Sequence, residues 1–93
     1  MDVHLQCWYM GRQTINFKLS GVTTSMTIND LLYQYWLKVI NPNTNSAFTW
    51  GYCGPKMDLV RYSNEQRFPR DTTMGQLGLV NEEAFTVLCG FSY

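Results

Sequence analysis

The chain has few charged residues and no excess of either sign. Charged residues make up 15% of the sequence, and seven basic residues balance seven acidic ones. A neutral domain creates no strong field for a polyanion or for an anionic membrane surface. This balance argues against nucleic acid and membranes as partners.

Long apolar runs are also absent. No stretch approaches the roughly 20 residues that cross a bilayer. Residues 1–6 lack the basic region and the apolar region of a signal peptide. The sequence therefore predicts an intracellular protein of the cytoplasm or the nucleus.

Cysteine and histidine are scarce. The three cysteines, Cys7, Cys53 and Cys89, are odd in number and widely spaced, which fits reduced thiols better than a disulfide framework or paired zinc ligands. The single histidine, His4, lies an odd number of residues from Cys7 on a predicted strand, so the two side chains point to opposite faces. We expect no metal, no cofactor and no enzymatic activity.

The chain does contain enough apolar material for one core. Hydrophobic residues make up 45% and aromatic residues 15% of the 93 residues, which excludes a disordered composition. A chain of this length cannot be divided into two cores. Residues 1–93 are therefore predicted to form a single domain.

The first half of the chain predicts a hairpin followed by a helix. Residues 3–10 and 14–19 alternate apolar with polar side chains and read as two paired strands. Thr27 is placed as a helix N-cap, with Asp30 in position to answer it. The predicted helix runs over 28–40 and ends ahead of Pro42, because the residue before a proline avoids helical angles.

The second half predicts a loop and then further strands. Residues 41–46 are polar or proline and predict a loop, and residues 48–52 alternate aromatic with small or polar side chains as a third strand would. A short strand is predicted at 59–62, and residues 63–71 read as an exposed loop.

The end of the chain predicts a tight helical turn within 72–79 and a closing strand at 84–89. Two strands, one helix, two more strands and a closing strand cannot form a parallel βαβαβ array. The predicted class is α+β, a β-grasp in which a mixed sheet of four to five strands packs on one helix.

These elements resemble the ubiquitin-like superfamily in their order and spacing. The hairpin over 3–19 and the capped helix starting at Thr27 match its first half. Residues 52–56, Tyr-Cys-Gly-Pro-Lys, stand where the family turns out of its third strand, and residues 71–79 leading into 85–88 resemble its closing signature.

The resemblance implies a protein-interaction module, with two departures. Ubiquitin-like modifiers end in a glycine pair, whereas this sequence reads Cys89-Gly90-Phe91, so we expect a domain that is not conjugated. The stretch Arg67-Phe68-Pro69-Arg70 resembles the phenylalanine-proline-arginine loop of UBX domains, which grips a hexameric ATPase.

The predicted helix is apolar over more of its surface than one sheet can cover. Beyond the core-facing residues, the apolar arc continues over Tyr33, Trp36, Leu37 and Ile40. Either the chain itself covers them, by the 41–46 loop or the 91–93 tail, or a partner protein or a second copy of the chain does. Trp36 is the expected anchor of such an interface, which includes a possible homodimer through the helix.

Two other surfaces are candidates for partner binding. Thr86 and Leu88 match the outward-facing positions of the last strand that ubiquitin presents to its receptors, with Gly51 at the matching place on the predicted third strand. Residues 67–70 form the other candidate, where exposed aromatic, proline and guanidinium groups can insert into a groove.

The function expected from these features is a non-catalytic, intracellular interaction module of the ubiquitin-like type that binds an unidentified protein partner. Two alternatives stay open. One is the ubiquitin-fold domain of a ubiquitin-pathway enzyme that recruits a catalytic partner. The other is a viral or bacterial ubiquitin-like protein that engages host proteins.

Overall fold

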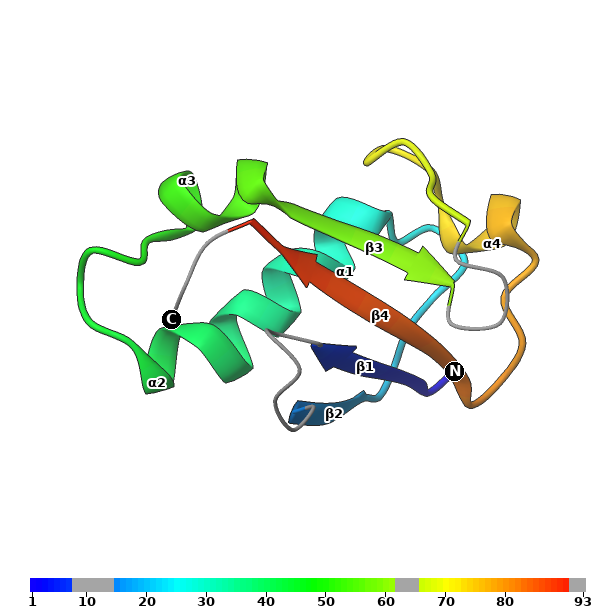
Figure 1. Cartoon of the computed structure of the whole chain (residues 1–93). Helices are drawn as coiled ribbons and strands as arrows, with labels where there is room; N and C mark the ends of the chain where they lie inside the picture. The colour runs from blue at the N-terminus through cyan, green and yellow to red at the C-terminus, as the bar shows by residue number, and fades with distance from the viewer. Residues whose placement is uncertain (8–14, 62–65, 91–93) are drawn as a thin grey trace.

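The computed structural model of the chain describes residues 1–7, 15–61 and 66–90, and in these a helix crosses one face of a four-stranded sheet (Figure 1). The strands are β1 (Val3–Cys7), β2 (Ile15–Leu19), β3 (Met57–Arg61) and β4 (Glu83–Cys89). Their order across the sheet is β2-β1-β4-β3.

The sheet is mixed because its two central strands are distant in sequence. β1 and β4 run parallel, with Leu5 beside Phe85, while the outer strands β2 and β3 pair antiparallel with them. Parallel strands need a long crossover, and the helix supplies it. The predicted α+β class and the β-grasp arrangement are confirmed.

The main helix begins where the sequence predicts. α1 (Ile28–Tyr35) is preceded by Thr27, whose hydroxyl accepts a hydrogen bond from the backbone N–H of Asp30 at 3.2 Å. The Asp30 carboxylate accepts the N–H of Thr27 at 2.9 Å in return. This reciprocal capping box satisfies two backbone donors that the first helical turn would otherwise leave unpaired.

The helix does not end before Pro42, so that expectation is wrong. A π-helical turn, η1 (Trp36–Ile40), continues α1, and a further turn, α2 (Asn41–Asn43), contains the proline. Proline lacks an N–H and its ring clashes with the carbonyl four residues before it. In the wider π turn the N–H of Asn41 reaches the carbonyl of Trp36 instead, so the chain passes Pro42 with helical angles.

The third strand predicted at 48–52 is also wrong. That region begins a helical turn, α3 (Trp50–Cys53), capped by the hydroxyl of Thr49, and a 3₁₀ turn, η2 (Gly54–Lys56), follows it. The third strand is β3, which overlaps the short strand predicted at 59–62. The aromatic alternation arises from packing against the helix and does not reflect a pleated strand.

The closing elements match the sequence. α4 (Met74–Leu77) is capped by Thr73 and Gln76, and Gly78 ends it at φ 66°, where a residue without a Cβ is favoured. An isolated bridge joins Thr27 to Thr73, so the start of α1 and the start of α4 are held together. The 84–89 strand is confirmed as β4.

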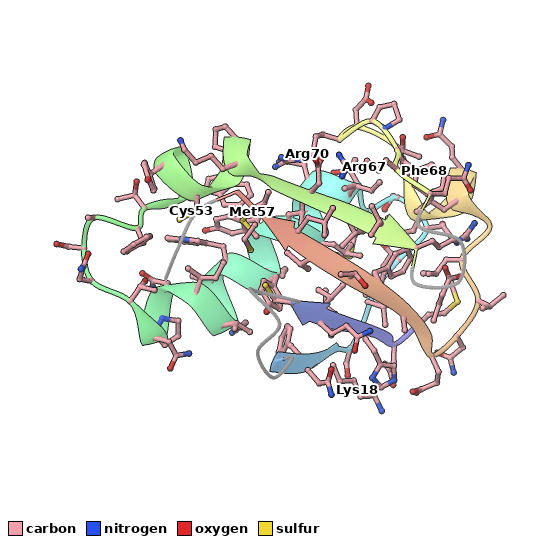
Figure 2. All side chains as sticks on the ribbon, viewed as in Figure 1. Lys18, Cys53, Met57, Arg67, Phe68 and Arg70 are labelled. Carbon is pink, nitrogen blue, oxygen red and sulfur yellow. The ribbon has the colours of Figure 1, made fainter. Side chains whose placement is uncertain are left out.

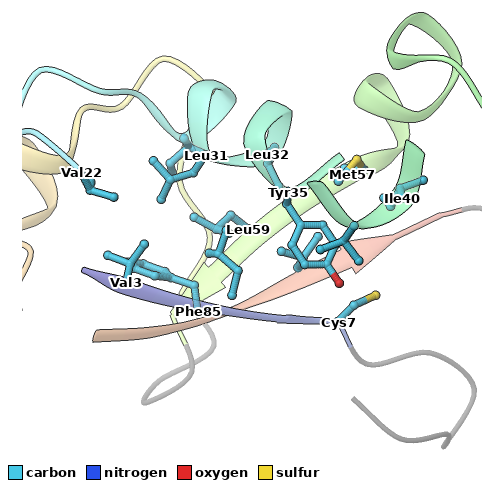
Figure 3. Packing of buried hydrophobic residues seen from close by; sticks show 14 of the residues in the cluster. Val3, Cys7, Val22, Leu31, Leu32, Tyr35, Ile40, Met57, Leu59 and Phe85 are labelled. Carbon is cyan, nitrogen blue, oxygen red and sulfur yellow. The ribbon is translucent and has the colours of Figure 1, made fainter. Parts of the chain in front are cut away.

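The core fills the space between α1 and the inner face of the sheet. Figure 3 shows Leu31, Leu32 and Tyr35 on the helix side and Val3 and Phe85 on the sheet side. All five side chains are fully buried.

Among the described residues no helix is long and apolar enough to span a membrane.

Part of what the sequence predicted lies outside the described residues. This holds for the end of the first strand at 8–10, for the hairpin turn through residue 14, for residue 62 and the start of the following loop, and for the 91–93 tail.

Candidate protein-interaction surfaces

The apolar side of the helix is largely covered by the chain itself. Ile40 is 0% exposed and therefore cannot contact a partner, which corrects its place among the predicted contact residues. Trp36 and Leu37 are partly buried, and the indole N–H of Trp36 donates to the carbonyl of Phe48 at 2.9 Å. The segment that folds over this side holds α3, which the sequence had placed in the sheet.

Three aromatic rings from α1, η1 and α3 meet beside the helix. The rings of Tyr33 and Trp36 stack with their centroids 5.9 Å apart. The centroid of the Trp50 ring lies 5.2 Å from that of Tyr33 and 6.1 Å from that of Trp36. Tyr33 remains 37% exposed. The sequence predicted Tyr33 and Trp36 as surface residues but missed Trp50, because its pattern indicated a strand.

The 67–70 stretch lies along the β3 edge of the sheet, and Figure 2 shows Arg67, Phe68 and Arg70 there. Arg67 pairs with Val60 in an isolated bridge, and its guanidinium is 3.5 Å from the carboxylate of Asp58. Phe68 is partly buried against the core, with the guanidinium of Arg61 5.9 Å from its ring centroid. Arg67 and Pro69 are exposed, whereas Phe68 and Arg70 are half-buried.

Arg70 ties three elements together. Its Nη1 donates to the carbonyls of Gly54 at 2.8 Å and Met57 at 3.0 Å, and its Nη2 donates to the side-chain oxygen of Asn29 at 2.7 Å. Its guanidinium also lies 5.9 Å from the ring centroid of Trp50. Sequence reasoning assigned Arg70 to partner binding and did not foresee this internal role, which depends on contacts between distant segments.

A shallow depression of about 330 Å³ lies beside Arg70. It is lined by one cation, one amide and otherwise apolar groups: Asn29, Trp50, Gly51, Gly54, Pro55 and Arg70. A Cβ on Gly54 would lie 3.1 Å from atoms of the Trp50 ring, so the ring rests directly on the backbone of that glycine.

The outer face of the sheet carries the third candidate surface. Thr86 and Leu88 are half-buried and alternate along β4 with the fully buried Phe85 and Val87, so they point away from α1. Gly51 does not accompany them, because it lies in α3 and not on a strand; its predicted place beside Thr86 and Leu88 is wrong.

A charged network lies at the other side of the outer face. Glu82 contacts the His4 ring at 2.5 Å and Lys18 at 3.4 Å, and Lys18 is also 3.4 Å from Asp2. A hydrogen bond from His4, followed by the charge of Lys18, lowers the pKa of the Glu82 carboxyl. The two carboxylates, Asp2 first, raise the pKa of Lys18.

We expect Glu82 to contribute to acid sensitivity of the fold. A carboxyl whose pKa is lower in the folded state stabilises the fold above its unfolded pKa and loses that contribution as the pH falls through its folded value. The urea midpoint, measured between the neutral range and strong acid, should therefore fall less steeply in Glu82→Gln than in the wild type. Equal slopes for the two proteins would contradict the prediction.

An ion pair that is more deeply buried than those of Glu82 joins β3 to β4. The Nε of Arg61 is 2.5 Å from the Glu83 carboxylate, its Nη2 donates to the carbonyl of Leu77 at 2.6 Å, and both charged side chains are less than one-fifth exposed. Their charges compensate each other within the fold. Arg61 and Glu83 are thus structural and are not free to bind a ligand.

The thiols of Cys53 and Cys89 show no sign of nucleophilic activation. Burial is the main cause that raises the pKa of Cys53. Contact with Cys7, whose sulfur lies 3.6 Å away, and then burial raise the pKa of Cys89. Among the described residues no group of three or more histidine, cysteine or acidic side chains is arranged to hold a metal ion.

The geometry defines a β-grasp domain with several small candidate surfaces. Comparison with family models gives no match, and no curated protein matches the sequence. Similarity to other proteins is therefore visible only in the fold.

Solved structures show that similarity over nearly the whole chain. Caldiarchaeum subterraneum ubiquitin superposes with a TM-score of 0.67 at 10% identity, covering 99% of this chain and 95% of that one. The UBL domain of yeast Ddi1 gives 0.58 at 16% identity, covering 99% and 91%. A chain of the toluene 4-monooxygenase HD complex with the inhibitor 4-bromobenzoate gives 0.63 at 16% identity, covering 95% of each chain. The chain has the ubiquitin-like fold.

Proposed function

We propose that this protein is a non-catalytic interaction module of the ubiquitin-like type, which binds a partner protein and is not itself conjugated. The observation that carries the proposal is the outer face of the sheet, where β4 presents Thr86 and Leu88 while α1 lies on the opposite face. On that face Leu88 offers an apolar side chain between Thr86 of the same strand and Asp58, which stands opposite it on β3.

The absence of activation at the thiols supports a role without catalysis. The pKa values of Cys53 and Cys89 are raised, and His4 is bonded to Glu82 on the outer face. A nucleophile and its general base must lie within hydrogen-bond reach of each other. No such pair involving these groups is present among the described residues.

The environment of Gly90 supports the view that the module is not conjugated. Its N–H donates to the carbonyl of Lys56 at 2.7 Å, and a Cβ at this position would meet the same oxygen at 3.1 Å. This glycine therefore serves the end of the sheet. A glycine held by this backbone hydrogen bond does not belong to a free tail of the kind that a conjugated modifier uses.

Replacing Leu88 by lysine tests the proposal. Leu88 stands opposite Asp58 in the β3–β4 register, so the new cation meets a carboxylate and the fold is not penalised by like charges. We expect the amount of partner captured by the immobilised protein to fall at least about tenfold, as for loss of an interface anchor. Quantitative mass spectrometry of the captured proteins measures it.

The matched control is Val80→Lys, because Val80 is an exposed apolar residue at 62% outside the sheet. It should capture the same proteins as the wild type, and both variants should melt as cooperatively as the wild type. Undiminished capture by Leu88→Lys would remove the outer face from the proposal.

A second candidate function is that of an accessory chain in an enzyme complex. The likeness to the chain from the toluene 4-monooxygenase complex covers 95% of both chains, so a whole chain of this fold occurs in an enzyme assembly. This candidate retains the idea of a ubiquitin-fold unit that recruits a catalytic partner. Co-purification with a stoichiometric enzyme, abolished by Leu88→Lys, would favour it.

A further inference from the structure

The charge of Arg70 is not neutralised within the described part of the chain. Its hydrogen-bond partners are two backbone carbonyls and the amide oxygen of Asn29. By contrast, Arg61 faces Glu83 at 2.5 Å and Arg67 faces Asp58 at 3.5 Å. A half-buried guanidinium with only neutral partners leaves an excess of positive potential at its surface.

A second cation is adjacent in sequence to the lining of the depression. Lys56 follows Pro55 in the chain, is exposed, and has its Nζ 4.2 Å from the ring centroid of Tyr52 and 3.4 Å from the Tyr52 carbonyl. Among the described residues no carboxylate lies within salt-bridge distance of Lys56. Lys56 therefore adds a second positive charge one residue from the lining residue Pro55.

The carboxylates nearby in sequence do not enter the depression. Asp30 follows the lining residue Asn29, but its carboxylate accepts the N–H of Thr27 in the helix cap. Asp71 follows Arg70, is exposed and is not among the lining residues. The lining thus combines one positive charge with an indole ring, a proline ring and two glycines, and it contains no negative charge.

This combination suits one kind of occupant. The faces of Trp50 and Pro55 offer apolar contact, and the glycines Gly51 and Gly54 permit a close approach of another backbone. The guanidinium of the lining residue Arg70 and the ammonium of Lys56, which follows the lining residue Pro55, favour carboxylates beside the apolar contact.

We propose that the depression beside Arg70 docks an extended acidic segment of the partner protein, with an apolar or proline side chain on Trp50 and carboxylates facing Arg70 and Lys56. This inference rests on the proposed interaction function and specifies a second contact surface and its ligand chemistry. None of the residues that line the depression belongs to β4, on whose outer face Leu88 lies.

The direct test uses a short fluorescein-labelled peptide in which leucine, proline and glutamate alternate. Its binding to the full chain is followed by fluorescence anisotropy and by amide and indole NMR shifts. We expect shifts at Gly51, Gly54 and the indole of Trp50, and an affinity at least about tenfold higher than for the same peptide with glutamine in place of glutamate. Added salt should weaken only the glutamate peptide.

The protein variants separate this site from general charge. Arg70 is unsuitable for substitution, because it also holds the fold together. Lys56→Gln should weaken the glutamate peptide by about two- to fivefold, the range of an exposed charge pair. Lys18→Gln removes the same charge at the opposite, β2 edge of the sheet, where Figure 2 shows Lys18, and should leave the affinity unchanged.

The inference would be overturned by equal affinity for the glutamate and glutamine peptides. Equal effects of the Lys56 and Lys18 substitutions, or NMR shifts confined to the outer sheet face, would overturn it as well. Displacement of the peptide by inorganic phosphate or by a single-stranded oligonucleotide at the peptide's own concentration would also overturn it. If the glutamate peptide does not bind while Leu88→Lys still abolishes partner capture, the proposed function stands and the proposed peptide site is rejected.

Discussion

Replacing Arg70 by methionine is expected to lower the free energy of unfolding by about 2–4 kcal/mol, because three hydrogen bonds from a charged donor are lost, two of them to backbone carbonyls. The carbonyls that Arg70 binds belong to Gly54 and Met57, both buried residues. Methionine keeps most of the aliphatic volume, so the loss reports the guanidinium and not a cavity. Urea unfolding followed by circular dichroism measures the change.

Arg67→Met is the matched control. Arg67 lies in the same stretch, but its guanidinium is exposed and its Asp58 partner is 3.5 Å away in solvent. Exposed pairs of this kind contribute at most about 1 kcal/mol. Equal losses in the two variants would show that Arg70 does not hold η2, β3 and the start of α1 together.

Replacing Gly54 by alanine is expected to destabilise the protein by about 1–3 kcal/mol, the usual cost of overpacking. The new Cβ would stand 3.1 Å from three atoms of the Trp50 ring. The Trp50 ring cannot move away freely, because other groups surround it. Its centroid lies 5.2 Å from that of Tyr33, 6.1 Å from that of Trp36 and 5.9 Å from the guanidinium carbon of Arg70.

The sign of the Gly54 effect should change when the ring is removed. Gly54 has helical angles, φ −54° and ψ −49°, which alanine adopts without strain. In a Trp50→Leu background, Gly54→Ala should therefore be neutral or stabilising by up to about 1 kcal/mol, because alanine restricts the unfolded chain. A double-mutant cycle from urea unfolding gives the coupling. An unchanged cost without the ring would mean that the backbone, and not Trp50, requires glycine here.

Local signals predicted the capped start of α1. At Thr27 a hydroxyl is followed three residues later by the carboxylate of Asp30, and the capping box forms. A second capping box forms at Thr73 in the turn predicted within 72–79, although the cap itself was not predicted. Such signals succeed because the interacting groups lie within one helical turn. The strand alternation of β1 and β4 was readable for a similar reason, since each strand buries one face.

Local signals failed between residues 36 and 56. The sequence around Trp50 alternates as a strand does, and Pro42 predicts a helix end, yet both segments are helical. Contacts between distant residues decide this region: Trp36 bonds the carbonyl of Phe48, and Trp50 packs on Gly54 and Tyr33. No short-range pattern distinguishes an aromatic that packs on a helix from one that lies on a sheet.

The candidate sites also divide into features that the sequence could predict and features that depend on contacts between distant segments. The outward direction of Thr86 and Leu88 was expected from the resemblance to the ubiquitin-like superfamily, and in β4 they alternate with the buried Phe85 and Val87. The burial of Ile40 and the internal bonds of Arg70 were not expected, since they depend on which segments fold over them. The depression beside Arg70 has lining residues from 29 to 70, so it exists only once those segments have met.

By itself, the sequence determined that apolar and polar side chains alternate on strands around one capped helix, because that pattern and those caps are set by neighbours in the chain. Only the tertiary structure decided which segment covers the helix, where the third strand lies and which arginine of the described residues has no carboxylate partner. The reason is that burial and ion pairing depend on distances between residues far apart in sequence, and these are fixed only when the core closes.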